Sequence, residues 1–125
     1  MLCKDALLQV IQRQTEGLMY HDEMTDYYAF LHLDMLKELH HKQTKDELCA
    51  LKKSKCDYIK SFESLPFYTA TDPRVIPADW KSKTFSDIDE EGLKILIRDS
   101  LEGYLDWERE TCEIYKSMAL VFKEN

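Results

Sequence analysis

Residues 4–42 read KDALLQVIQRQTEGLMYHDEMTDYYAFLHLDMLKELHHK, and this stretch decides the fold. Its apolar residues recur every three or four positions for about ten turns, which is the period of one face of an α-helix. The midline of that face is polar, because Gln14, His21, Thr25 and His32 fall within roughly 40° of one another. A polar group at the centre of a buried face needs a hydrogen-bonding partner. We therefore expect one long helix with two histidines pointing into a core.

The rest of the chain predicts two more helices and a long loop. Thr44 and Glu47 have the spacing of a capping box, which predicts that a second helix runs from about 45 to 63. All three prolines fall in residues 64–87 together with several aromatic residues. A connection of this length is typical of a compact cover or of a functional lid. Acidic residues then begin a third helix over about 88–122.

Composition limits the class of protein. The chain of 125 residues is 44% hydrophobic and 33% charged, with three glycines and three prolines, which is typical of a folded, helix-rich protein. We predict one all-α domain over 1–125, an antiparallel helical bundle of three main helices. In chain order the first helix is long, the second is shorter and the third is long. The Pro- and aromatic-rich crossover loop connects the second helix to the third. Neither a signal-peptide pattern nor a membrane-spanning stretch is present in the sequence, so we expect a cytoplasmic protein.

Charge is divided unevenly along the chain. The net charge of −7 disfavours nucleic acid and anionic membranes as partners. Residues 42–60 carry six lysines against three acids, whereas residues 87–113 carry ten acids against three basic residues. These complementary segments could face each other within one bundle or between subunits, or they could remain separate solvated surfaces. The acidic segment could also bind a basic protein partner.

The middle of the long helix is apolar on a second side as well. That side must be covered by the loop, by another helix or by a second subunit. We expect a small binding and interaction module that forms a homo-oligomer or binds a basic protein, and that is not an enzyme. The residues predicted to form the interaction surface are Tyr20, Tyr27, Phe30, Leu33 and Trp80.

The polar midline of the core allows a second interpretation. Glu108 is the one acid within the apolar arc of the third helix, and by rise along the helices it falls level with the central histidines. A carboxylate against a histidine could fix helix register, bind a metal or act as an acid–base pair. The residues predicted to meet there are His21, His32 and Glu108.

The chain also resembles the ferritin-like carboxylate bundles, which build a two-metal site from inward glutamates and paired Glu-x-x-His motifs. Glu38 and His41 have that spacing once, and Glu23, four residues before Tyr27, is similar to a first-helix ligand. The resemblance implies a site for iron, manganese or zinc to which Glu23, Glu38 and His41 contribute. Apart from this metal, the sequence predicts no cofactor.

Overall fold

The computed structural model describes residues 1–124, and within that range the chain is all-α with no strand. This confirms the prediction of an all-α bundle of three helices. No helix in the described range is long and apolar enough to cross a membrane. The three helices are α1 (Cys3–Phe30), α2 (Asp34–Phe62) and α3 (Glu90–Glu124), and the crossover, residues 63–89, contains the short 3₁₀ helices η1 (Ala78–Ser82) and η2 (Phe85–Asp87).

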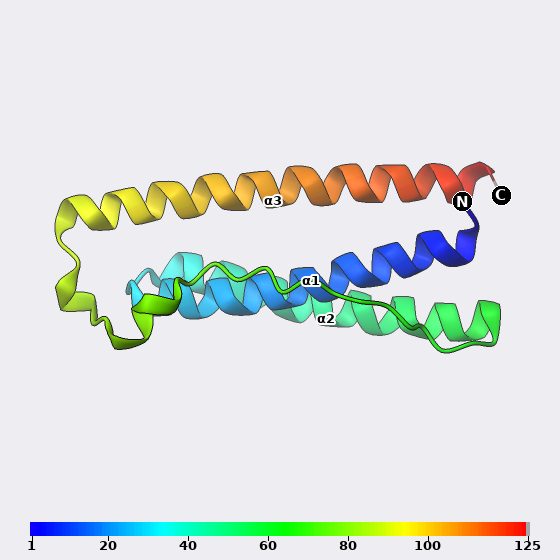
Figure 1. The fold of residues 1–125 in the computed structure, drawn as a ribbon, viewed down its shortest axis with the longest axis horizontal. Helices are drawn as coiled ribbons and strands as arrows, with labels where there is room; N and C mark the ends of the chain where they lie inside the picture. The colour runs from blue at the N-terminus through cyan, green and yellow to red at the C-terminus, as the bar shows by residue number, and fades with distance from the viewer. Residues whose placement is uncertain (125) are drawn as a thin grey trace.

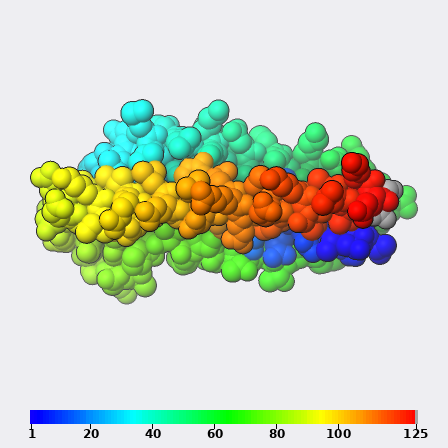
Figure 2. Space-filling view, turned by 90° about the horizontal axis from the view of Figure 1, so that it is seen from above, coloured from blue at the N-terminus to red at the C-terminus, as the bar shows by residue number. Residues whose placement is uncertain are grey.

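The helices form an elongated bundle in which α1 is antiparallel to both α2 and α3 (Figure 1). α1 and α2 make a hairpin, and the crossover then runs back along this hairpin, so that α3 is parallel to α2 (Figure 1). α3 lies over the hairpin as a ridge along the whole molecule, with α2 on one side and the crossover on the other (Figure 2). The direction of α3, which the sequence left open, therefore follows from the crossover.

The predicted boundary between the first two helices is wrong. The chain turns at residues 31–33, where His32 has a left-handed backbone with φ 59°, and α2 begins at Asp34. Thr44, predicted to cap a helix start, lies inside α2, and its hydroxyl donates to the His40 carbonyl oxygen. The turn contains neither glycine nor proline, which is why the pattern of the sequence did not reveal it. As a result α1 and α2 have nearly equal lengths, 28 and 29 residues.

The core consists of two apolar clusters. One, within the hairpin, gathers Ile11, Leu51 and Tyr58. Complete burial of a large apolar side chain contributes about 1.5–3 kcal/mol to stability, so these residues stabilise the contact between α1 and α2. The larger cluster joins the hairpin to α3 and to the crossover. Its buried residues are Tyr20, Met24, Tyr27, Tyr28 and Leu31.

The second apolar side of α1 is covered within the chain by the crossover and by α3. Trp80 of the crossover stacks on Tyr27 with ring centroids 5.4 Å apart, and Trp107 of α3 stacks on Tyr20 at 4.5 Å. Tyr20 and Tyr27 are each only 5% exposed, so the crossover acts as a packed cover. All the residues predicted to form an interaction surface pack in or against this larger cluster: Tyr20, Tyr27, Phe30, Leu33 and Trp80.

Candidate functional site: a buried histidine pair and an acidic crossover face

The centre of the bundle holds two histidines, one from each helix of the hairpin. The Nδ1 atoms of His21 on α1 and His40 on α2 are 2.9 Å apart, within hydrogen-bonding distance. The two residues are 3% and 0% exposed. One ring must donate and the other must accept, so this hydrogen bond requires at least one neutral imidazole. The turn at residues 31–33 creates the pair, because it sets these two positions opposite each other in the hairpin.

Tyrosine rings from α1 and α3 surround the pair. Tyr28 stacks on His40 with centroids 5.4 Å apart, and Tyr104 of α3 lies 4.8 Å from His40 and 6.0 Å from His21. Burial lowers the pKa of both histidines to about 4, and the neighbouring His40 adds to the effect at His21. Burial also raises the pKa of Tyr28 and Tyr104. All four side chains are therefore neutral at pH 7.

Hydroxyl and amide groups connect this layer to α3. Tyr28 Oη shares a hydrogen bond of 2.7 Å with Ser100 Oγ, and Gln43 Nε2 of α2 donates to Tyr104 Oη. Two other buried atoms, His40 Nε2 and Gln43 Oε1, have no partner among residues 1–124. Each such atom costs about 1–3 kcal/mol when it is left unsatisfied. The layer therefore combines good packing with incomplete hydrogen bonding.

The residues predicted to bind a metal do not come together. His21 pairs with His40, whereas His32 is exposed in the turn and contacts Phe85, with ring centroids 4.5 Å apart. Glu108 is exposed on α3, outside the core. Across the described part of the chain, no three His, Cys, Asp or Glu side chains are grouped as a metal ion would require. The structure thus assembles a histidine pair in place of the predicted His21, His32 and Glu108 set.

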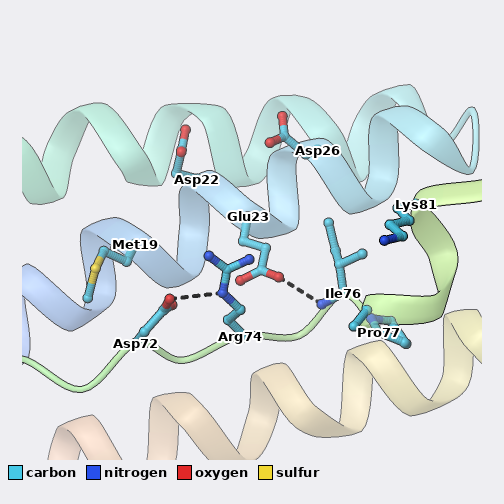
Figure 3. A pocket seen from close by; sticks show the side chains of 10 residues that line it. Met19, Asp22, Glu23, Asp26, Asp72, Arg74, Ile76, Pro77 and Lys81 are labelled. Atoms are coloured by element: carbon cyan, nitrogen blue, oxygen red, sulfur yellow. Dashed lines mark hydrogen bonds and ion pairs between the residues drawn. The ribbon is translucent and has the colours of Figure 1, made fainter.

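Glu23, assigned to a metal by the ferritin-like resemblance, instead holds the crossover. Its Oε1 atom accepts a hydrogen bond from the backbone N–H of Val75 at 3.1 Å. The same atom accepts the N–H of Ile76 at 2.8 Å (Figure 3). Glu16, two turns earlier on α1, accepts the N–H of Thr71 at 2.8 Å. The two glutamates therefore fasten the extended part of the crossover to one side of α1. Their spacing of seven residues places both on the same side of α1, but it does not indicate what they bind.

A buried arginine connects α1 to α3 near the histidine layer. The Arg13 guanidinium lies 3.6 Å from the centroid of Trp107, and its Nε donates to Thr111 Oγ1 at 2.9 Å. Glu16 is its buried ionic partner at 3.8 Å. The other neighbour of the indole is Tyr20, whose ring is inclined by only 7° to it. Trp107 thus packs between the Arg13 cation and the Tyr20 ring. The sequence analysis did not predict this arrangement.

Four surface pockets lie along the crossover, and neither His21 nor His40 lines them. One pocket of about 550 Å³ lies between α1 and the crossover (Figure 3). Within it, Asp72 pairs with Arg74 at 3.0 Å. The charged residues that line this pocket are Asp22, Glu23, Asp26, Asp72, Arg74 and Lys81.

On the other side of the crossover, α3 presents a row of exposed acids. Asp99 borders a pocket together with Trp80, and Glu110 borders another together with Thr71, so both lie on the edge of α3 that faces the crossover. Positions 7, 11 and 14 residues after Asp99 return to nearly the same edge of a helix. These positions are Asp106, Glu110 and Glu113. The basic residues of α3 interrupt this row, because Arg98 pairs with Asp99 at 3.2 Å and Lys116 pairs with Glu113 at 3.8 Å.

Comparison of the chain with protein-family models, with curated proteins and with solved structures gives no match. The ferritin-like resemblance therefore stays a prediction that rests on helical architecture and one Glu-x-x-His spacing. Glu38 and His41, which have that spacing, are both exposed on α2. Function has to be inferred from the geometry of the chain itself.

Proposed function

We propose that the protein is a non-catalytic interaction module that binds a basic protein segment along the crossover. The observation that carries this proposal is the placement of exposed carboxylates on both sides of the crossover, which we call the acidic face. The acidic face is formed by Asp22 and Asp26 of α1, Asp72 of the crossover, and Asp99, Asp106, Glu110 and Glu113 of α3.

Several carboxylates acting together favour a basic partner more than any one of them would. Four of the seven carboxylates already form ion pairs with other described residues of the chain: Asp72 with Arg74, Asp99 with Arg98, Glu110 with Arg13 and Glu113 with Lys116. An exposed ion pair contributes only about 0–1 kcal/mol, so the cations of a basic partner can compete for these carboxylates, and acids on both sides of the crossover orient that partner. The net charge of −7 adds to this attraction. The acids also border partly buried apolar side chains, Ile76 and Trp80, on which the stems of lysine or arginine can pack.

The geometry favours a basic partner over association of two copies. The interaction surface predicted from the second apolar side of α1 is used inside the chain, since Tyr20 and Tyr27 are buried under α3 and the crossover. Sedimentation velocity at low and high protein concentration checks this part of the proposal. A dimer that forms before the partner is added would shift the proposed function towards self-association.

A pair of matched variants tests the acidic face. The probe is a fluorescently labelled helical peptide rich in lysine and arginine, and the readout is anisotropy. Asp99→Asn combined with Glu110→Gln removes two charges from the acidic face, whereas Glu38→Gln combined with Asp57→Asn removes two exposed charges from α2. We expect the first variant to weaken binding by roughly tenfold and the second by less than about threefold.

The two variants separate a specific surface from general charge attraction. An equal loss of affinity in both would mean that only net charge matters, and it would contradict the proposal. Binding that does not weaken as salt is added would contradict it as well, because attraction between exposed charges is screened by salt.

A further inference from the structure

We propose that the His21–His40 pair is an acid-sensitive latch, whose protonation releases α3 from the α1–α2 hairpin so that the bundle opens reversibly in mild acid. This inference does not depend on the partner proposed above. It adds a regulatory element, because α3 carries most of the acidic face and its release would take that face apart.

The geometry of the pair makes it sensitive to protons. The hydrogen bond of 2.9 Å between the two Nδ1 atoms is lost when both rings carry two N–H groups, since neither can then accept. A single added proton already places a positive charge in a layer where the two residues are 3% and 0% exposed. No ion pair to either ring is formed within residues 1–124, so that charge has no local compensation.

The groups that face the pair from each helix do not provide a counter-charge. Tyr20 and Tyr28 come from α1 and Tyr104 from α3, and burial raises the pKa of all three, so they remain neutral in acid. Two carboxylates lie in the adjacent part of the bundle: Glu108, exposed on α3, whose charge adds to burial in raising the pKa of Tyr20 and Tyr104, and Glu47 on α2. Burial and the charge of Glu108 raise the pKa of Glu47, which reduces its negative charge in acid.

α3 is the element that protonation would displace. Only Ser100 and Met118 of α3 are buried, whereas α1 alone buries eleven residues. α3 also meets the pair directly, because the ring of Tyr104 packs against both histidines. Moving Tyr104 away admits water to the two rings, and water stabilises the protonated imidazoles. Protonation of the pair and release of α3 are therefore coupled.

The direction and the pH range follow from the pKa values. Burial lowers the pKa of both histidines from 6.5 to about 4, so between these values the closed bundle binds fewer protons than the open one. The closed form is fully favoured above pH 6.5 and loses stability as the pH falls towards 4. At pH 5 each histidine shifts the equilibrium towards the open form by roughly thirtyfold.

Trp107 can report the position of α3, because its ring is stacked on Tyr20 in the closed form. In a Trp80→Phe background it is the single tryptophan, since the chain contains two. We expect its emission to shift to longer wavelength between pH 6.5 and 4, while far-UV circular dichroism retains most of the helix signal. His21→Asn combined with His40→Asn should move this transition at least about one pH unit lower.

His41→Asn is the matched control, because His41 is adjacent to His40 in sequence but exposed. This variant should keep the transition of the parent. An unchanged transition in the His21→Asn/His40→Asn variant would overturn the latch, and so would loss of helix in step with the Trp107 signal. If the His21→Asn/His40→Asn variant does not fold, NMR titration of the histidine ring protons in the unaltered protein tests the latch instead. Apparent pKa values of the pair below about 5 support the latch, and values near 6.5 contradict it.

Discussion

Replacing Trp107 with leucine tests how α3 is held on the hairpin. The leucine fills part of the indole volume, so the main losses are the stack on Tyr20 at 4.5 Å and the contact with the Arg13 guanidinium at 3.6 Å. An aromatic pair contributes about 0.5–1.5 kcal/mol beyond its buried area, and a cation over a largely desolvated ring contributes up to about 2 kcal/mol. The Arg13 side chain is 7% exposed, which places it near the desolvated limit. We therefore expect Trp107→Leu to lower the free energy of unfolding by about 2–3 kcal/mol.

Urea denaturation followed by far-UV circular dichroism measures this loss, because the signal does not depend on tryptophan. Leu105→Ala is the control on the same helix, since Leu105 is 50% exposed and its truncation should cost less than about 1 kcal/mol. A double-mutant cycle between Trp107→Leu and Tyr20→Leu then isolates the stack, for which we expect a coupling of about 0.5–1.5 kcal/mol. The reasoning is refuted if Trp107→Leu costs no more than Leu105→Ala, or if the coupling is zero.

Three further changes test other contacts of the structure. Gly103→Ala should raise the free energy of unfolding by about 0.5–1 kcal/mol in thermal or urea denaturation, because a Cβ there meets no atom within 4 Å and alanine favours a helix. Glu23→Ala removes the acceptor that fastens the crossover, so trypsin should cleave after Arg74 several times faster. Glu108→Gln should change stability by less than about 0.5 kcal/mol because Glu108 is exposed. The same change should lower the pKa of Glu47, as measured by NMR titration, because the Glu108 charge helps to raise it.

The first two of these changes have matched controls. Gly17→Ala is also a glycine replacement inside a helix, but its Cβ would lie 3.2 Å from a glutamate side chain of α2, so we expect no comparable gain. Asp22→Ala changes the exposed neighbour of Glu23 and should leave cleavage of the crossover unchanged. If Gly17→Ala raised the free energy of unfolding as much as Gly103→Ala, the close glutamate side chain would not affect the result, and the reasoning from packing would be wrong. Faster cleavage in both Asp22→Ala and Glu23→Ala would show that the two hydrogen bonds of Glu23 do not control the crossover.

The helical period was sufficient to place His21 in the core. Its position on the midline of the apolar stripe predicted a buried polar side chain, and it is 3% exposed. The partner could not be predicted, because that depends on where the chain turns. A turn near Thr44 would bring His21 opposite residues well beyond His40 in the sequence. The turn at residues 31–33 brings it opposite His40. Without glycine or proline at the turn, no local signal distinguished the two.

Glu23 and Glu108 show a different limit of sequence reasoning. The angle on its helix predicts Glu108 in the core, and the ferritin-like resemblance predicts Glu23 as a metal ligand, but neither argument says which neighbour the side chain meets. The extended crossover supplies backbone N–H groups to Glu23, and no helical period could predict its path. Glu108 lies at the edge of the apolar arc, where a small rotation of α3 decides between burial and exposure, and the structure leaves it exposed.

The parallel arrangement of α2 and α3 has a consequence for the order in which the chain can fold. His21 and His40 are 19 residues apart, whereas Arg13 and Thr111, which join α1 to α3, are 98 residues apart. Contacts between nearby residues close smaller loops and form sooner than contacts between distant ones. The hairpin can therefore assemble while the second apolar side of α1 is still exposed to water. The crossover and α3 then cover that side, and until they do so it is the part of the chain most open to aggregation.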